Sequence, residues 1–339
     1  MKKILVTGAN GFVGSAVCKE LLDNNYQVTA LHRSTSDLAS IQNLNLNKVA
    51  GDIRDLDFLK QILPGHDGII HIAALFRQAK HPDQVYFDIN VQGVKNVFDA
   101  AIESGVKRII HCSTVGVHSH IPNPPADENE IFRPGDIYQE SKAQGEKLAQ
   151  SYFDKELIEG LIIRPAMIWG PGDSRTLKLF KGIANKRFPL IGTGKTSVHW
   201  VLVSDLARAF RLALEKSDLN KEVFIIAGQR PVEMQYMVKE IAKNFNVSAP
   251  RFKIPALPIQ VLGTIVETIC IPFGIEPPIY RRRVDFFTKT RAFNWQKAKK
   301  LLKYEPEYSF ETEVKKIAAW YLENNWIEKQ QEIISSKAA

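Results

Sequence analysis

The sequence has few cysteines and none of the spacings typical of disulfide frameworks or zinc sites. Its 339 residues include only Cys18, Cys112 and Cys270, an odd number with no Cys-x-x-Cys pair. This usage argues against a disulfide-stabilised domain and against structural zinc, so no metal site is expected. It favours a reducing compartment, and we therefore expect a cytoplasmic protein.

We also expect no export signal at the N-terminus. The apolar run Ile4–Val6 is too short for one, and a glycine-containing loop follows it at once. We expect Ile4–Val6 to be the first strand of the fold instead.

Acidic side chains are outnumbered by basic ones, 37 to 45, and the formal net charge is +8. This balance favours anionic partners such as dinucleotides, acidic substrates and membrane headgroups. Specific nucleic-acid binding is not expected, because neither zinc-finger spacing nor an aromatic RNA-binding signature is present. With 45% hydrophobic and 24% charged residues, the chain has the composition of an ordinary globular protein.

The first half of the chain alternates apolar strands with amphipathic helices, which predicts an α/β fold with a doubly wound parallel sheet, the Rossmann fold. The expected strands are Ile4–Val6, Gln27–His32, Lys48–Gly51, Gly68–Ala73, Lys107–Cys112 and Leu157–Arg164. The expected helices between them include Phe12–Asn24, Val85–Glu103 and Ile137–Asp154.

Later segments are expected to complete that sheet and to add a second lobe. Val198–Val203 and Val223–Ala227 have the composition of strands that return to the sheet. The predicted division is a dinucleotide-binding domain of residues 1–165 with 196–230 returning to it. The remaining residues, 166–195 and 231–335, are expected to form a smaller, mostly helical substrate lobe.

One strongly apolar segment runs from Ile254 to Ile279, and the basic run Arg281-Arg282-Arg283 follows it. Several prolines and the central Glu267 argue against a membrane-spanning helix. Two interpretations remain open. The segment is either a substrate-lobe helix with a basic end in solvent, or an apolar lid that grips a hydrophobic substrate or touches a membrane surface through residues 254–283.

A glycine-rich loop follows the first strand directly and opens the first helix. Its glycines are three residues apart, an arrangement that allows a tight turn and close approach of the backbone to a pyrophosphate. The helix N-terminus then offers unpaired N–H groups to the anion. The loop residues expected to contact a dinucleotide are Thr7, Gly8, Asn10, Gly11, Phe12, Val13 and Gly14.

The end of the second strand lacks the acidic residue that would bind a ribose 2′-hydroxyl and favour NAD. Arg33 and Ser34 stand there instead. A guanidinium matches the geometry of a phosphate, so we predict a preference for NADP over NAD. The alternative is that Arg33 simply faces solvent.

Tyr138 and Lys142 lie four residues apart, which places both on one face of a helix. The ordinary pKa of tyrosine, about 10, is too high for a base near pH 7. A neighbouring ammonium group favours the phenolate, so the tyrosine can exchange a proton with a substrate oxygen during hydride transfer.

Two hydroxyl side chains, Ser113 and Thr114, stand at the end of the preceding strand. Either could orient the substrate oxygen toward Tyr138. The alternative is that they satisfy backbone groups at the strand end, and this alternative weighs more for Ser113.

Taken together, these motifs resemble the extended, or atypical, short-chain dehydrogenases of the NAD-dependent epimerase/dehydratase type along nearly the whole chain. The resemblance implies a catalytic set of Thr114, Tyr138 and Lys142, with Ser113 beside it. His118 stands where many relatives have tyrosine. Further residues that the resemblance places at the cofactor are Asp52, Ile53, Ala73, Ala74, Asn90, Pro165 and Met167. It also makes a homodimer through the Tyr138 helix an expectation.

Within that family the sequence resembles the 3β-hydroxysteroid dehydrogenase-like and dihydroflavonol reductase-like branch. Val115-Gly116 follows Thr114 where dehydratases carry an acidic pair, and Gly194–Trp200 lacks the arginine of many sugar-nucleotide enzymes, although Lys195 is an alternative there. We therefore predict an NAD(P)-dependent oxidoreductase that interconverts a ketone and a secondary alcohol on a small hydrophobic substrate. The alternatives are a nucleotide-sugar epimerase with tightly bound NAD and, more remotely, a non-catalytic dinucleotide-binding regulator.

Five residues are candidates for contacting the substrate. The alternative for the four large apolar ones is that they are part of the hydrophobic core. The five candidates are Phe76, Thr114, Met167, Trp169 and Phe180.

Overall fold

The computed structural model describes residues 2–76, 81–250, 253–270 and 281–328. The chain divides into two compact units, which are described separately. The first unit contains residues 1–168, 198–231 and 290–307, and the second contains residues 169–197, 232–289 and 308–339.

The first unit is built on a seven-stranded parallel sheet with the order β11-β6-β5-β4-β1-β2-β3. This order reverses beside β1, as in a doubly wound Rossmann fold, so the predicted fold class is confirmed. The strands of this sheet are β1 (Lys3–Thr7), β2 (Gln27–His32), β3 (Asn47–Ala50), β4 (Gly68–His71), β5 (Arg108–Cys112), β6 (Glu159–Pro165) and β11 (Val223–Ile226).

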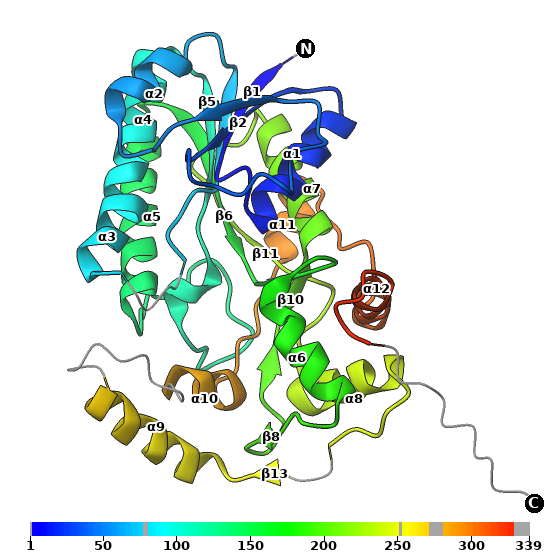
Figure 1. Ribbon diagram of the computed structural model, residues 1–339. Coiled ribbons are helices and arrows are strands. Elements are labelled where there is room, and N and C mark those ends of the chain that lie inside the picture. Colours follow the sequence, from blue (N-terminus) through cyan, green and yellow to red (C-terminus); the bar gives the residue numbers. More distant parts are fainter. Residues whose placement is uncertain (1, 77–80, 251–252, 271–280, 329–339) are drawn as a thin grey trace, which may run out of the picture. The chain divides into compact units, whose positions relative to one another are not determined.

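Helices cover both faces of the sheet (Figure 1), because successive strand residues point to opposite sides. In β1, Ile4 and Val6 join the core under α1 and α7, whereas Leu5 joins the core under α2, α4 and α5. The helices of this unit are α1 (Phe12–Asp23), α2 (Leu56–Ile62), α3 (Asp83–Phe87), α4 (Gly93–Glu103), α5 (Ile137–Asp154), α7 (Val203–Glu215) and α11 (Gln296–Leu302).

The predicted helix Val85–Glu103 is interrupted. A π-helical turn, η1 (Asp88–Gln92), separates α3 from α4. Such turns are frequent at functional sites, and this one carries Asn90, which was predicted at the cofactor.

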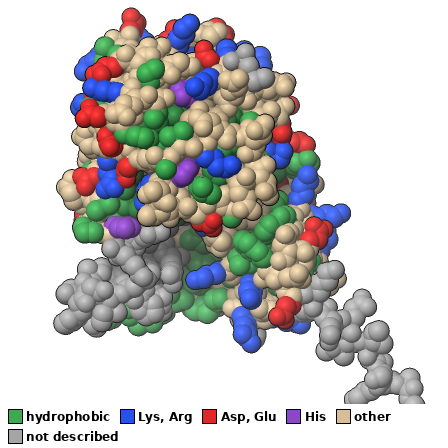
Figure 2. Space-filling view, turned by 45° about the horizontal axis from the view of Figure 1, so that its top comes forward, with side chains coloured by type: hydrophobic (Ala, Val, Ile, Leu, Met, Phe, Trp, Pro, Cys, Tyr) green, Lys and Arg blue, Asp and Glu red, His purple; other side chains and the backbone are tan. Residues whose placement is uncertain are grey.

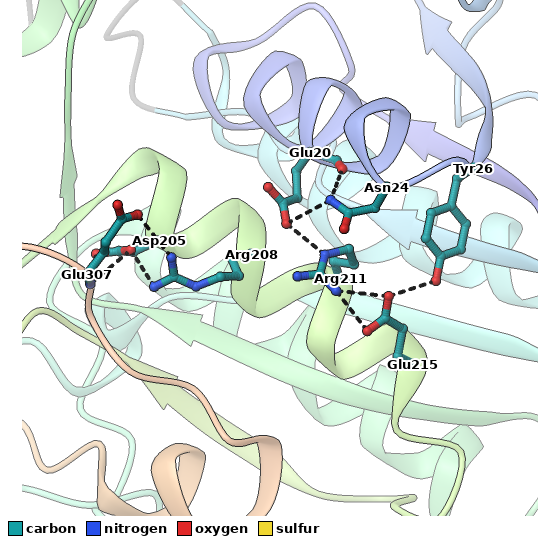
Figure 3. A network of polar contacts seen from close by, with 8 residues as sticks. All are labelled: Glu20, Asn24, Tyr26, Asp205, Arg208, Arg211, Glu215 and Glu307. Atoms are coloured by element: carbon teal, nitrogen blue, oxygen red, sulfur yellow. Dashed lines mark hydrogen bonds and ion pairs between the residues drawn. The ribbon is translucent and has the colours of Figure 1, made fainter.

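Helix α1, which begins at the glycine loop, is fastened to α7 by a charged cluster (Figure 3). The Arg211 guanidinium donates to Glu20 at 2.7 Å and to Glu215 at 2.9 and 3.0 Å, and the Tyr26 hydroxyl donates to Glu215 at 3.0 Å. This partly buried network fixes the start of the fold against a helix about 190 residues later, as the separation of Glu20 and Arg211 shows.

A second cluster on α7 holds a C-terminal segment in the first unit (Figure 3). Asp205 is fully buried and accepts from the Arg208 guanidinium at 2.6 Å and from the Glu307 backbone N–H at 3.2 Å. The Tyr304 hydroxyl donates to the Ala227 carbonyl at 3.0 Å. Residues 290–307 therefore belong with the sheet, which differs from the predicted boundary that gave 231–335 to the substrate lobe.

The predicted return of Val198–Val203 to the main sheet is wrong, although the return of Val223–Ala227 is confirmed as β11. This stretch contains β9 (Ser197–Val198) and β10 (Trp200–Leu202), and β10 pairs with β7 (Met167–Trp169) in a separate two-stranded sheet. The apolar pattern predicted a strand correctly, but it could not specify the pairing partner.

The second unit is mostly helical and has an aromatic core. Trp169, Phe180 and Tyr321 are each fully buried, and Phe310 stacks on Trp169 with ring centroids 5.3 Å apart. Its helices are α6 (Ser174–Ala184), α8 (Met234–Asn244), α9 (Ala256–Cys270), α10 (Arg281–Thr288) and α12 (Phe310–Glu323). Its short strands include β8 (Leu190–Ile191), β12 (Val232–Glu233) and β13 (Lys253–Ile254).

On the face shown in Figure 2, acidic and basic side chains are interspersed rather than gathered by sign. This face therefore lacks the continuous basic stripe typical of nucleic-acid binding. Among the described residues, no helix combines the length and apolarity needed to cross a bilayer.

Candidate cofactor and catalytic site

The loop after β1 needs glycine at two positions for steric reasons. Gly8 has φ +68°, and a Cβ there would lie 2.9 Å from the Ala73 backbone. A Cβ on Gly14 would lie 2.1 Å from the Gly8 carbonyl oxygen. The loop is thus packed against both the segment that follows β4 and its own helix, the close approach that a dinucleotide-binding turn requires.

The first turn of α1 is left open to an anion. Gly11 occupies the N-cap, so no side chain caps the helix, and no acidic residue stands in the first turn. The Asn10 side chain is directed away from this turn, because its amide NH2 donates to the Asp37 backbone carbonyl at 3.2 Å. The Asn10 backbone carbonyl accepts from the Ser40 hydroxyl at 2.8 Å. Phe12 and Val13 are half-buried. The residues present therefore fit a bound pyrophosphate, with the α1 N–H groups as donors.

Thr7 cross-links the ends of β1 and β4. Its hydroxyl oxygen accepts from the N–H groups of Ile72 and Ala73, each at 3.1 Å, and lies 2.7 Å from His71 Nδ1. With both lone pairs engaged, the hydroxyl has its proton left to donate to His71 Nδ1, so that ring is neutral. Thr7 is fully buried, so it supports the cofactor loop rather than lining it.

The predicted adenine-side pair, Asp52 and Ile53, is held by two partners that the sequence did not reveal. Arg54 pairs with Asp52 through two side-chain bonds of 2.7 and 3.1 Å, and it holds the pKa of Asp52 below its usual value. The buried Asn96 amide donates to the carbonyls of Ile53 and Arg54 at 3.1 and 2.9 Å. Asn96 therefore fixes this turn from α4.

Asn90 connects the segment after β4 with the catalytic helix. Its side chain accepts from the Leu75 N–H at 2.7 Å and donates to the Ser141 hydroxyl at 2.9 Å. Ser141 in turn donates to the Tyr138 carbonyl at 2.9 Å. A Cβ on Gly145 would lie 2.2 Å from the Asn90 carbonyl oxygen, so the two helices touch here. Ser141, which sequence reasoning missed, thus helps to position Tyr138.

Lys142 lies in the interior, one turn along α5 from Tyr138. Its side chain is almost fully buried, and Nζ donates to the Cys112 carbonyl at 2.7 Å. Burial lowers the pKa of Lys142, and the Glu146 carboxylate opposes this shift. The ammonium group therefore has a fixed position at the end of β5.

The two hydroxyls after β5 have different surroundings. Thr114 caps the short 3₁₀ helix η2 (Val115–His118), and its oxygen accepts from the Gly116 N–H at 3.0 Å while the side chain stays half-buried. Ser113 is buried and donates to Glu146, which forms a buried ion pair with Arg164 at 2.5 Å. The Ser113 proton is thus committed to a side-chain network, whereas the alternative interpretation of this residue expected a backbone partner.

Phe76 is 47% exposed and lies edge-on to Tyr138, with ring centroids 5.1 Å apart. It places an apolar surface beside the predicted catalytic hydroxyl. Trp169 and Phe180, by contrast, are fully buried in the aromatic core of the second unit and lend no surface to a substrate there. Met167 is half-buried and its N–H donates to the His199 carbonyl at 3.0 Å.

The remaining predicted positions divide by exposure. Arg33 and Ser34 are exposed after β2, and within the described ranges no ion pair engages Arg33. Ala73 and Ala74 are half-buried, whereas Pro165 is buried in β6. In the part of the chain that the structure describes, no group of three or more His, Cys, Asp or Glu side chains has the arrangement of a metal site.

Curated relatives cover most of the chain. A 2-alkyl-3-oxoalkanoate reductase from Stenotrophomonas maltophilia is 28% identical, over 94% of this chain and 98% of its own. An N-acetyl-α-D-glucosaminyl-diphospho-ditrans,octacis-undecaprenol 4-epimerase from Escherichia coli O157:H7 is 29% identical, over 77% of each chain. A 3β-hydroxysteroid-dehydrogenase/decarboxylase from Arabidopsis thaliana is 28% identical, over 92% of this chain and 78% of its own.

Solved structures agree with the fold. A dTDP-glucose 4,6-dehydratase from Streptomyces venezuelae, solved with NAD bound, is 25% identical with a TM-score of 0.77, covering 96% of this chain and 99% of that one. The sequence model of the NAD dependent epimerase/dehydratase family matches residues 4–227. The expected enzyme class and the expected nicotinamide dinucleotide are thereby confirmed. The chain belongs to the NAD-dependent epimerase/dehydratase family, the extended short-chain dehydrogenases that its motifs resemble.

Proposed function

We propose that the protein interconverts a ketone and a secondary alcohol on a small apolar substrate, with net transfer of hydride. The observation that carries the proposal is the exposed Phe76 ring set edge-on against Tyr138, one helical turn from the buried Lys142. An apolar wall beside a proton-transferring hydroxyl suits a hydrophobic carbonyl compound better than a polar sugar diphosphate.

In the proposed reaction, Tyr138, Lys142 and Thr114 have different roles. Tyr138 gives a proton to the carbonyl oxygen or takes one from the alcohol, and the positive charge of Lys142 favours the phenolate. Thr114 accepts from the Gly116 N–H, which leaves its own O–H to donate to the substrate oxygen. A nicotinamide dinucleotide would be held at Gly8, Gly11 and Gly14, and the chemistry it would supply there is the donation or acceptance of a hydride.

The surroundings of Thr114 argue against dehydration. Val115, the next residue, is a buried core side chain, so no carboxylate follows Thr114 to act on a neighbouring carbon. Epimerisation remains the second candidate, because one of the relatives acts on a lipid-linked sugar diphosphate.

Cofactor handling separates these two functions. Purified protein with free NADPH or NADH and a panel of hydrophobic ketones should show net loss of nicotinamide absorbance. An epimerase would instead retain its cofactor tightly, isomerise a sugar-nucleotide panel and leave that absorbance unchanged. The second result, with no ketone reduced, would overturn the proposal.

We further propose that NADP is preferred. Arg33 is exposed after β2, while Arg54 already engages the carboxylate of Asp52. This arrangement leaves the Arg33 guanidinium for a 2′-phosphate.

Arg33→Ala is expected to raise the KM for NADPH about 10- to 100-fold, the scale of one charge-assisted hydrogen bond, with little change for NADH. Steady-state kinetics with both cofactors measure this. Arg187→Ala removes an equally positive, exposed side chain from the second unit and controls for net charge. Equal KM changes for the two cofactors would contradict the assignment, as would a wild-type preference for NADH.

A further inference from the structure

Helix α9 presents an apolar surface to solvent. Leu257, Val261 and Ile265 recur every four residues on one face and are 69%, 52% and 50% exposed. Leu262, beside them, is 48% exposed, and Ile254, just before the helix, is 40% exposed. Single exposed apolar residues are ordinary, but a contiguous apolar face is typical of a surface that another body covers.

The opposite side of α9 faces its own unit. Gly263 is buried and lies about 200° around the helix from Val261 and Ile265. Helix α10 packs beside α9 (Figure 1), and Gln260 bonds to Thr288 at 3.5 Å. The exposed face is therefore the outward one.

The composition of α9 is unlike that of an ordinary surface helix. Surface helices carry charges on the solvent side, whereas the sequence Ala256–Cys270 contains one charged residue, Glu267. A helix this apolar is normally found in a core or against lipid. It is too short to cross a bilayer, so contact with lipid would be interfacial.

The sequence around α9 is basic. Residues 251–291 contain seven Lys and Arg against three Asp and Glu, which is half of the net charge of the whole chain. One basic residue, Lys289, is neutralised by Asp285 at 3.0 Å. The basic residues are Arg251, Lys253, Arg281, Arg282, Arg283, Lys289 and Arg291.

This positive charge distinguishes between two bodies that could cover the apolar face, a second copy of this chain and a lipid bilayer. In a two-fold dimer through α9, each basic segment would meet its own copy, and like charges would oppose one another. A bilayer with anionic headgroups instead supplies an apolar layer for the exposed apolar face of α9 and negative charge for the basic residues of 251–291.

We propose that α9 docks on an anionic phospholipid membrane, lying in the plane of the interface with Leu257, Val261, Leu262 and Ile265 toward the acyl chains. The excess of basic over acidic residues in the sequence of 251–291 supplies the attraction to the headgroups. The docking concerns the second unit alone and is independent of the reaction proposed above.

The test is co-sedimentation of the full-length protein with vesicles. Wild type should bind vesicles of phosphatidylcholine mixed with phosphatidylglycerol, should bind phosphatidylcholine alone more weakly, and should lose affinity as salt is added. The triple variant Leu257→Gln, Val261→Gln, Ile265→Gln should lower the partition coefficient at least about tenfold, because binding scales with the apolar area buried.

A matched variant, Ile131→Gln with Leu157→Gln, removes two side chains of the first unit that are 59% and 51% exposed. It should bind as wild type does. All five positions are exposed, so the variants should keep the wild-type circular dichroism spectrum and Tm. Absence of wild-type binding to anionic vesicles would overturn the proposal. So would unchanged binding by the triple variant, or a dimer in light scattering that this variant alone abolishes without any vesicle binding.

Discussion

Tyr138→Phe is expected to lower turnover by about two to three powers of ten, the usual scale of acid–base catalysis by a positioned side chain. The substitution removes the hydroxyl and keeps the ring, so the edge-on contact with Phe76 at 5.1 Å is preserved. Ser141 bonds the Tyr138 backbone carbonyl and not its side chain, so the helix should be unaffected. The loss should therefore appear in kcat, while binding of the dinucleotide changes little.

Tyr152→Phe is the matched control for this prediction. Tyr152 lies on the same helix, α5, and its hydroxyl donates to Asp99. Both residues are far in sequence from the glycine loop. This variant should keep near-normal turnover, at a small cost in stability. Near-normal turnover in Tyr138→Phe itself would contradict the proposed mechanism.

The second large effect is loss of stability in acid. Burial lowers the pKa of His71 to about 3 and that of His199 to about 4, and it holds the pKa of His111 well below its usual value. Since only the unfolded chain then takes up these protons, stability is complete above the unfolded pKa, about 6.5, and falls as the pH is lowered toward the folded values.

The size of the effect follows from the shifts. His71 and His199 each contribute roughly 3 kcal/mol that is lost by pH 4, against a total stability of about 5–15 kcal/mol for an ordinary protein. The protein should therefore unfold near pH 4, as monitored by urea titrations at a series of pH values.

His111→Phe tests this assignment. Both ring nitrogens of His111 are buried and without a hydrogen-bond partner among the described residues, and the ring packs against His71 and Phe98. Replacing it with an apolar ring should cost little at pH 7. The pH dependence should become shallower by about 1.4 kcal/mol per pH unit between pH 4 and 6. An unchanged slope would show that this histidine does not remain neutral in the folded protein.

Local sequence was sufficient for much of the fold and for the positions of the candidate site. Buried parallel strands are continuous apolar runs, and the glycine loop is recognisable because its steric demands, as at Gly8 and Gly14, fall within one short stretch of sequence. The Tyr138–Lys142 spacing likewise follows from helical geometry alone.

What the sequence did not reveal depends on distant partners. Asn96 and Ser141 look like ordinary helix residues until their partners, Ile53 and Asn90, are placed beside them. The role of Ser113 is set by Glu146, 33 residues later. The burial of Trp169 depends on α12, where its indole N–H donates to Glu313 at 2.7 Å. No local pattern encodes these pairings, because they follow from tertiary packing.

The hydrogen bond from the Glu307 backbone N–H to the Asp205 carboxylate has a consequence for how the chain can be divided. The dinucleotide-binding unit is one body in space but three separate stretches of polypeptide, since the chain leaves it after residue 168 and again after 231 before coming back with Tyr304 and Glu307. During synthesis the glycine loop is made long before its own unit is finished, because residues 290–307 complete that unit. Neither a single stop codon nor a single proteolytic cut can separate the two units, because no position in the chain has all of one unit before it and all of the other after it.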